Sequence, residues 1–488
     1  RYIRRQRQMC IRDRISCGAS FLTSEKMNNI FINGKKEAIQ NVDHDITLLD
    51  WLRNNLKMTG TKEGCAEGDC GACSVIINEE NHSNLKPVNS CLVRIGQVVG
   101  KNIVTIEGLG NDKKPHPLQV AFSRENASQC GYCTPGFIIS GVSLLNSDKE
   151  INDNTINDAF SGNLCRCTGY SPIIKALKTV AKYDVQIKPK HFKEETYDIK
   201  LGNVTYHHPV KIDELKKLTK IKNFKFLAGG TDLNLQRPII NEKENSIISL
   251  SSIEELKKIK VSNNKILLGS SVTIETFLEF IEDKMPEIVE ILKRFGSPLI
   301  RNQATIGGNL CTSSPIGDLA PVLLVLKSNL NIFGKDGRKS IPIKDFFKGY
   351  RKNILKKDQI LVSIEIPIPH KSNKLFFWKL SKRFDQDIST ISLAINIKTQ
   401  NQIIKELYIA AGGVAEIPKD LDNLSRRMIN KNTDEAIKLA IDDIDKYINP
   451  ISDLRGTSLY RRDSFKGLFK RLKRCLKDDV KTMSVMEF

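Results

Sequence analysis

The decapeptide Gly64-Cys65-Ala66-Glu67-Gly68-Asp69-Cys70-Gly71-Ala72-Cys73 holds three cysteines and three glycines, and Cys91 follows after a gap of 17 residues. Thiolates that converge on one inorganic cluster need a loop that bends around it, and glycine reaches the backbone angles of such a bend. The spacing C-x-x-x-x-C-x-x-C with a distant fourth cysteine is the plant-type [2Fe–2S] pattern. The sequence therefore predicts that Cys65, Cys70, Cys73 and Cys91 bind one cluster.

A zinc site is the alternative for these four cysteines, because zinc also binds four thiolates. Zinc modules usually show two C-x-x-C-like knuckles. Here a four-residue gap and a two-residue gap share one glycine-rich loop, which favours the iron–sulfur cluster.

The residues before this loop predict two local elements. Residues 29–39 predict two short strands joined by a tight turn at Asn33-Gly34, a dipeptide typical of β-hairpins. Residues 46–56 carry leucines and Trp51 at helical spacing.

A second cysteine set comprises Cys130, Cys133, Cys165 and Cys167, as C-x-x-C and, 31 residues later, C-x-C. Thr134-Pro135 and Ser171-Pro172 predict an N-cap and a proline at the first helical position after each pair. Two helix N-termini would then favour anionic thiolates. An isolated C-x-x-C would fit a thioredoxin-like redox pair, but the companion C-x-C argues against that reading.

Length and composition exclude several classes of protein. The chain has 488 residues, which predicts about three domains, and 40% of them are hydrophobic. No apolar run reaches the roughly 18–20 residues of a membrane helix. The formal charge of +20 could attract nucleic acid, but no recognition motif accompanies it, so we expect neither nucleic-acid nor membrane binding.

The remaining cysteines are expected to be inert. Residues 1–26, with Cys10 and Cys17, are basic and lack a signal-peptide apolar region, so we expect a non-native or disordered tail and a reducing, cytoplasmic compartment. Cys311 and Cys475 stand alone in the sequence.

Two glycine-bearing loops follow a polar stretch at residues 186–200 that reads as a linker. The first is Phe226-Leu227-Ala228-Gly229-Gly230-Thr231-Asp232-Leu233, and the second includes Thr305-Ile306-Gly307-Gly308-Asn309. Adjacent glycines let backbone amides approach a diphosphate, although a single Gly-Gly pair is more often a plain turn. Neither loop has the Rossmann fingerprint G-x-G-x-x-G.

Together these motifs resemble the molybdenum hydroxylase family, in particular the iron–sulfur/FAD subunit of two-subunit bacterial xanthine dehydrogenases. The segments QCGYCTPGF and NLCRCTGY carry the closest match, and the resemblance runs from Asn29 to about Arg462. It implies a multidomain α+β fold. The implied parts are a tail (1–26), a β-grasp ferredoxin domain (27–110), an all-α helical-bundle [2Fe–2S] domain (111–185), the linker (186–200), a two-part non-Rossmann α+β FAD domain (201–370) and a C-terminal α+β domain (371–488).

The resemblance also assigns roles to residues. Phe226 to Leu233 and Thr305 to Asn309 would hold FAD, with Phe295, Asp318, Leu361 and Lys379 completing the pocket and Lys379 tuning the flavin ring. Gln129 would lie at an interface with molybdopterin, and no residue is expected to be catalytic. Lys379 could instead be a solvated charge, Gln129 a polar linker residue, and Phe295 a core residue.

The implied function is electron relay from a large molybdopterin-binding partner subunit, in a heterotetramer of two small and two large subunits. Electrons from purine oxidation would pass through two [2Fe–2S] clusters to FAD and then to NAD+. Residues 462–481 are a candidate basic amphipathic helix that could contact a partner. Three alternatives stay open: an aldehyde- or N-heterocycle-oxidising relative, a stand-alone [2Fe–2S] flavoprotein reductase, and a zinc-structured binding protein.

Overall fold

The computed structural model describes residues 29–39, 41–78, 85–181 and 195–477, which form two compact units. The first unit holds the described residues up to Val210 together with Ile221–Leu227 and Leu233–Ser252. The second unit holds Lys211–Lys220, Ala228–Asp232 and the described residues from Ile253 onward. The predicted tail at residues 1–26 and most of the predicted linker lie outside the described residues.

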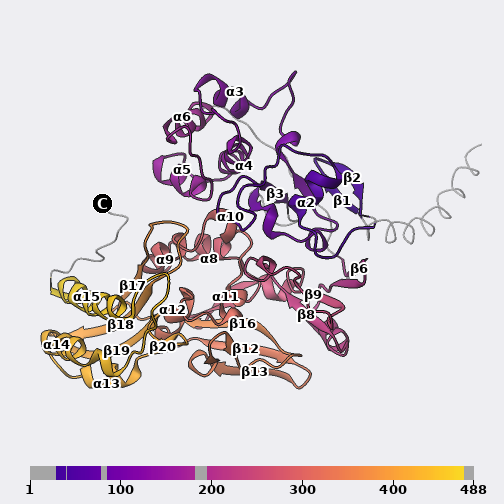
Figure 1. Ribbon diagram of the computed structural model, residues 1–488. Helices are drawn as coiled ribbons and strands as arrows, with labels where there is room; N and C mark the ends of the chain where they lie inside the picture. Colours follow the sequence, from indigo (N-terminus) through magenta and orange to yellow (C-terminus); the bar gives the residue numbers. More distant parts are fainter. Residues whose placement is uncertain (1–28, 40, 79–84, 182–194, 478–488) are drawn as a thin grey trace, which may run out of the picture. The chain divides into compact units, whose positions relative to one another are not determined.

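The first unit begins with a five-stranded sheet in the order β2-β1-β5-β3-β4 (Figure 1). Ile32 pairs with Lys35 across the turn, and Asn33 (φ 52°) and Gly34 (φ 81°) both take the left-handed backbone of a two-residue hairpin. The predicted hairpin is confirmed. The strands are β1 (Asn29–Ile32), β2 (Lys35–Ala38), β3 (Ser74–Asn78), β4 (Lys86–Asn89) and β5 (Asn102–Val104).

The helix predicted at residues 46–56 is also present. Thr47 Oγ1 accepts a hydrogen bond from the Asp50 amide and caps α2 (Leu48–Asp50), which continues as the π-helix η2 (Trp51–Asn55). Short 3-10 helices follow at η3 (Ser90–Leu92), η4 (Ile95–Gln97) and η5 (Ile106–Gly108).

Four helices with a shared apolar core form the next part of the first unit (Figure 1). They are α3 (Pro117–Arg124), α4 (Thr134–Leu145), α5 (Asp153–Phe160) and α6 (Ser171–Val180). The predicted N-caps are wrong by one residue. Cys133 and Tyr170 hold the cap positions, and Thr134 and Ser171 are already the first helical residues; the Thr134 hydroxyl donates to Ser128 Oγ at 2.8 Å.

A four-stranded sheet, ordered β6-β7-β9-β8, completes the first unit. Its strands are β6 (Tyr197–Leu201), β7 (Val204–His208), β8 (Phe224–Leu227) and β9 (Ser246–Ser249). Strand β6 begins inside the range predicted as a linker. Ile199 and Tyr206 share a buried core with Ile30 and Ile32 of the first sheet. Because of this shared core, the segment 201–370, predicted as one FAD domain, divides between the two units.

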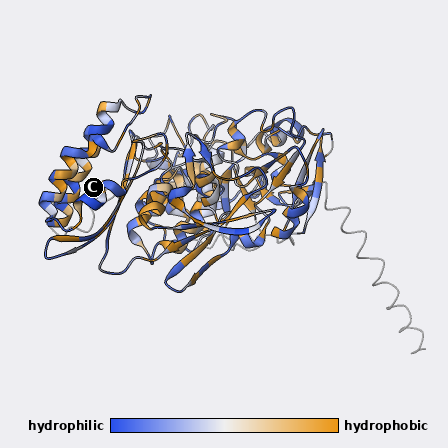
Figure 2. Ribbon diagram, turned by 90° about the horizontal axis from the view of Figure 1, so that it is seen from below, coloured by the Kyte–Doolittle hydropathy of each residue, from blue (hydrophilic) through white to orange (hydrophobic). Residues whose placement is uncertain are grey.

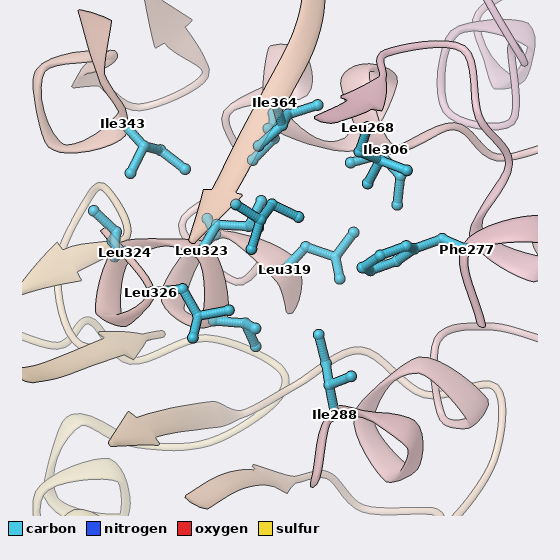
Figure 3. Packing of buried hydrophobic residues seen from close by; sticks show 14 of the residues in the cluster. Leu268, Phe277, Ile288, Ile306, Leu319, Leu323, Leu324, Leu326, Ile343 and Ile364 are labelled. Atoms are coloured by element: carbon cyan, nitrogen blue, oxygen red, sulfur yellow. The ribbon is translucent and has the colours of Figure 1, made fainter. Parts of the chain in front are cut away.

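The second unit contains a five-stranded sheet, ordered β10-β11-β16-β12-β13. Side chains from helix α12 (Leu319 and Leu323) gather with Phe277, Leu268 and Ile364 to form its core (Figure 3). The elements are η6 (Ile212–Glu214), α7 (Leu215–Leu218), η8 (Glu254–Lys257), β10 (Ile259–Ser262), β11 (Lys265–Gly269), α8 (Ile274–Ile281), η9 (Pro286–Ile288), α9 (Val289–Lys293), α10 (Pro298–Arg301), α11 (Ile306–Thr312), α12 (Leu319–Val325), β12 (Asn329–Gly334), β13 (Gly337–Pro342), η10 (Ile343–Asp345), β14 (Phe347–Gly349), β15 (Lys352–Asn353) and β16 (Ile360–Pro367).

A second sheet in this unit, ordered β17-β18-β19-β20, packs against the C-terminal helices. The predicted basic helix (462–481) is present as α15 up to Lys477, and its last four residues lie outside the described residues. Its apolar side chains are buried in that core: Phe465, Leu468, Phe469, Leu472 and Cys475. The helices of the chain carry both hydrophobic and hydrophilic residues (Figure 2). The elements are β17 (Lys374–Leu380), β18 (Ile391–Gln400), β19 (Ile403–Gly412), β20 (Lys419–Asp420), α13 (Asp422–Met428), α14 (Thr433–Asp443), η11 (Ile444–Lys446) and α15 (Ser458–Lys477).

Among the described residues, no helix combines the length and the apolar character needed to cross a membrane.

Candidate functional site

In the first unit, Cys65, Cys70 and Cys73 lie in the loop between η2 and β3, and Cys91 lies within η3. The sulfurs of Cys73 and Cys91 are 3.4 Å apart and buried. The thiols of Cys65 and Cys70 hydrogen-bond to each other, and both side chains are half-buried. The structure therefore brings together all four predicted ligands as two pairs.

The glycine-rich loop stabilises these sulfurs with backbone amides. The Asp69 amide donates to Cys65 Sγ at 3.3 Å, and the Cys65 amide donates to Cys70 Sγ at 3.3 Å. The hydrogen bond from Cys70, assisted by backbone amides, lowers the pKa of Cys65 to about 4. A Cβ at Gly64 would lie 2.6 Å from Cys70 Sγ, so glycine is required beside this ligand.

The second set is more exposed. Cys130 and Cys167 are exposed with sulfurs 3.5 Å apart, whereas Cys133 and Cys165 form a second hydrogen-bonded pair and are half-buried. Burial, together with the hydrogen bond to Cys165, raises the pKa of Cys133 to about 12. The Phe137 and Tyr170 rings lie 6.1 Å apart, which brings the N-termini of α4 and α6 together as predicted.

The pairing of the thiols suits a binuclear cluster. A [2Fe–2S] cluster has two irons, and each takes two thiolates, which matches two pairs in each set. Within the described residues no three His, Cys, Asp or Glu side chains converge on a single metal ion.

Direct contacts join the two cysteine sets. The Leu164 amide, next to Cys165, donates to the carbonyl of Cys70 at 3.0 Å. Asn163, which is buried, donates from Nδ2 to the Gly71 carbonyl at 3.2 Å. Sequence reasoning missed Asn163; its position two residues before Cys165 is the signal that could have identified it.

The first glycine loop offers hydrogen-bond donors. Among the described residues, the backbone amides of Ala228–Asp232 have no hydrogen-bond acceptor, which suits binding of a diphosphate. A Cβ at Gly229 would lie 1.9 Å from the Gln303 carbonyl, and Gln303 Nε2 donates to the Gly229 carbonyl at 2.6 Å. The loop thus packs on the chain that leads to the second glycine loop. The flanking Phe226, Leu227 and Leu233 belong to the first unit.

The second glycine loop uses its amides internally. Ile306 and Gly307 donate to the carbonyls of Val272 and Ser270, and Gly308 donates to Thr305 Oγ1. The Asn309 amide donates to the Thr305 carbonyl, while Asn309 Oδ1 is buried without a partner among the described residues. The amides of residues 306–309, which were predicted to meet a diphosphate, are therefore engaged in the fold.

Lys379 and Asp318 form one buried ion pair. Lys379 Nζ donates to Asp318 Oδ2 and to the Arg294 carbonyl, each at 2.8 Å. Asp318 Oδ1 accepts a hydrogen bond from Ser389, a buried residue absent from the prediction. Lys379 is therefore not the solvated charge of the alternative reading. Its proposed role beside the flavin stays a prediction.

The other predicted site residues have different surroundings. Phe295 is half-buried and packs against the core of the second unit, in agreement with the core alternative, and Leu361 is buried in that core on β16. Gln129 is exposed next to Cys130. Their cofactor contacts stay predictions.

Four domain families match the chain in order. They are a 2Fe-2S iron-sulfur cluster binding domain (residues 30–96), a [2Fe-2S] binding domain (105–178), a FAD binding domain in molybdopterin dehydrogenase (200–369) and a CO dehydrogenase flavoprotein C-terminal domain (376–476). The predicted α+β fold class with two iron–sulfur domains and a FAD-binding domain is confirmed.

Curated relatives include the xanthine dehydrogenase of Emericella nidulans, 30% identical over 83% of this chain and 35% of that protein. The xanthine dehydrogenase/oxidase of Rattus norvegicus is 30% identical over 83% of this chain and 36% of that protein. The chain thus spans about a third of the length of these relatives.

A chain of the carbon monoxide dehydrogenase from Hydrogenophaga pseudoflava shares the fold. It aligns with a TM-score of 0.51 and 23% identity over 55% of this chain and 94% of that chain. The reconstituted CO dehydrogenase from Oligotropha carboxidovorans also gives a TM-score of 0.51, with 23% identity over 56% of this chain and 97% of that chain.

Proposed function

We propose that this chain is the electron-transfer subunit of a xanthine dehydrogenase of the molybdenum hydroxylase family, because it matches two [2Fe-2S] domains, a FAD binding domain in molybdopterin dehydrogenase and a CO dehydrogenase flavoprotein C-terminal domain. In this proposal it relays electrons from a large molybdopterin-binding partner, in a complex with two copies of each subunit, through two [2Fe–2S] clusters and FAD to NAD+. Xanthine dehydrogenases among the relatives support purines as the substrate class.

The observation that carries the relay is the direct contact between the two cysteine sets. The hydrogen bond from the Leu164 amide to the Cys70 carbonyl joins the chain beside one ligand, Cys165, to another ligand. Electron transfer between two bound clusters requires a short, fixed separation. This bond, together with that of Asn163 to Gly71, holds the two loops in one arrangement.

Each part of the chain has a distinct task. The exposed pair Cys130 and Cys167 would place one cluster where a partner can deliver electrons. The buried pair Cys73 and Cys91 would hold the other cluster away from water. The free amides of Ala228–Asp232 would bind the FAD diphosphate. Flavin supplies the ability to accept single electrons and to give up two.

Analysis of the isolated chain tests this proposal. Two sets of four thiolates predict four irons and four labile sulfides per chain, with one FAD. NADH should bleach the visible absorbance, whereas xanthine alone should leave it unchanged. Adding a large molybdopterin-binding subunit should restore xanthine-dependent NAD+ reduction.

Each alternative outcome overturns a specific part of the proposal. Bleaching by xanthine alone would exclude a separate molybdenum subunit, and no response to NADH would exclude NAD+ as the acceptor. Restored oxidation of aldehydes or N-heterocycles in place of xanthine would identify a related hydroxylase. A colourless zinc-containing protein would exclude electron transfer altogether.

A further inference from the structure

Asn89 lies at the end of strand β4, two residues before the predicted cluster ligand Cys91, and its side chain is fully buried. Its Nδ2 donates to the Gly68 carbonyl at 2.9 Å, and its Oδ1 lies 3.7 Å from Cys73 Sγ. The backbone of Asn89 is paired with that of Ser74 across β3 and β4, so the sheet fixes the point from which the side chain extends. A buried amide side chain is tolerated only where hydrogen-bond partners meet it.

The Gly68 carbonyl belongs to a peptide group that also contacts a predicted cluster ligand. In a trans peptide the C=O and the following N–H point in opposite directions. The N–H of this group is the Asp69 amide, which donates to Cys65 Sγ at 3.3 Å. Asn89 and Cys65 therefore hold the same peptide group from opposite sides, and the hydrogen bond accepted by the C=O makes the N–H a stronger donor.

Gly68 also directs an amide of its own toward the first cysteine set. The residue is buried and has a φ of 92°, in the left-handed region that favours glycine. Its N–H donates to the sulfur of Cys91. Two consecutive amides, those of Gly68 and Asp69, thus reach one sulfur in each of the two thiol pairs of the first set.

These amides affect the charge that a bound cluster can carry. Reduction adds one negative charge, and N–H groups that donate to the cluster sulfurs stabilise it. The stabilisation is larger in a site of low dielectric, and Cys73 and Cys91 are buried. Asn89 Oδ1 acts in the opposite sense on Cys73, but at 3.7 Å from the sulfur its effect is smaller than that of two direct N–H donors.

We propose that Asn89 is a positioning residue that raises the reduction potential of the cluster at the first cysteine set. Through the Gly68 carbonyl it keeps the amides of Gly68 and Asp69 on the sulfurs of Cys91 and Cys65. One electron then passes more favourably to this cluster, which is reduced, from the cluster at the second set, which is oxidised in the same step. This inference rests on the proposed function.

Three variants of the full chain separate this role from general support of the fold. Asn89→Ala removes the hydrogen bond to the Gly68 carbonyl, and Asn89→Leu removes it while filling a similar volume. Ser74→Ala is the matched control. Ser74 is buried, and its Oγ donates to the Gly71 carbonyl of the same loop at 2.7 Å, so this variant loses a bond to the loop but leaves Gly68 held by Asn89.

The main measurement is a redox titration of each variant, followed by electron paramagnetic resonance. The cluster at the second set, whose ligands no variant changes, is the reference in the same sample. Pulsed electron paramagnetic resonance in H2O and in D2O measures the hyperfine coupling of exchangeable protons beside the first cluster. Iron and labile sulfide are determined in every variant. None of these measurements depends on NAD+ or on a partner subunit.

We expect both Asn89 variants to retain their iron but to show a lower midpoint potential of the first cluster relative to the second, with weaker coupling to exchangeable protons. Ser74→Ala should match the unmodified chain in both measurements. An unchanged or raised potential in an Asn89 variant that has assembled its clusters would overturn the inference, as would an equal fall in Ser74→Ala. If neither Asn89 variant assembles the first cluster, the residue serves assembly, and the inference is overturned as well. Absence of clusters from the unmodified chain would contradict the proposed function itself.

Discussion

The two cysteine sets present the same pairing of thiols in opposite surroundings. Cys73 and Cys91 are buried within the first set, whereas Cys130 and Cys167 of the second set are exposed. The first set depends on a glycine-rich loop and the second on the starts of two helices. The difference shows that four cysteines for the same kind of cluster can be placed in a buried loop or at the exposed starts of two helices.

The largest expected difference concerns loss of a ligand from each set. Cys73→Ser and Cys130→Ser should each lose one cluster, which is half of the iron, while the other cluster keeps its electron paramagnetic resonance signal. Cys73→Ser should also destabilise the apoprotein by roughly 1–3 kcal/mol, because it places a polar hydroxyl in a buried site whose oxygen acceptor, Asn89 Oδ1, lies 3.7 Å from the present sulfur. Cys130→Ser lies at the surface and should leave the apoprotein stability nearly unchanged. Iron analysis and urea unfolding measure both effects, and equal destabilisation would contradict the comparison.

The second prediction concerns access of a chelator to the two clusters. The exposed set should lose iron several times faster than the buried set when an iron chelator is added to the loaded chain. The separate resonance signals of the two clusters allow both losses to be followed in one sample. Simultaneous loss would mean that the whole unit opens before either cluster is reached.

The third prediction compares one glycine beside each set. Gly64→Ala should displace Cys70 and prevent most of the plant-type cluster from assembling, because the added Cβ would lie 2.6 Å from the sulfur. Gly169 has φ +69° and open space around it, so Gly169→Ala should cost only about 1 kcal/mol of backbone strain and retain its cluster. Cluster content after reconstitution measures the difference, and full assembly in Gly64→Ala would show that the loop can move.

The smallest expected effect comes from a contact between the two loops. The Tyr132 hydroxyl donates to the Glu63 carbonyl, and the side chain is 47% exposed. Tyr132→Phe should therefore retain both clusters and lower the free energy of unfolding by about 1 kcal/mol or less. Urea unfolding measures the change. A loss of several kcal/mol would make this bond a major link between the sets.

Residue spacing was sufficient to predict what lies close in sequence. The turn at Asn33-Gly34 follows from local rules, because both residues take the left-handed backbone of a tight hairpin; the assignment of the eight cysteines as cluster ligands stays a prediction. Spacing did not reveal which thiols pair, since that depends on how η3 and α6 pack. The cap positions at Thr134 and Ser171 were wrong by one residue, because each helix begins one residue earlier than the proline pattern predicts, at caps (Cys133 and Tyr170) that make no side-chain capping bond.

Tertiary contacts account for the remaining differences. The two Gly-Gly loops look equivalent in sequence, yet the amides of Gly307 and Gly308 are used within the fold while those of Ala228–Asp232 are not. Asn163 stands close to Cys165 in the sequence, but only the fold shows that its side chain donates to the Gly71 carbonyl. The pairing of Lys379 with Asp318 joins residues 61 positions apart, and no local pattern indicates it.

The close approach of Gly71 and Gly136 has a consequence for building new electron carriers from such domains. A methyl group on Gly136 would lie 2.2 Å from the Gly71 carbonyl, and one on Gly71 would lie 2.4 Å from the Gly162 carbonyl. The ferredoxin-like part and the helical part are therefore matched at the level of single atoms. A chimera that exchanges one part alone would need glycine at both positions and Asn163 beside them, so the two parts are exchangeable only as a pair.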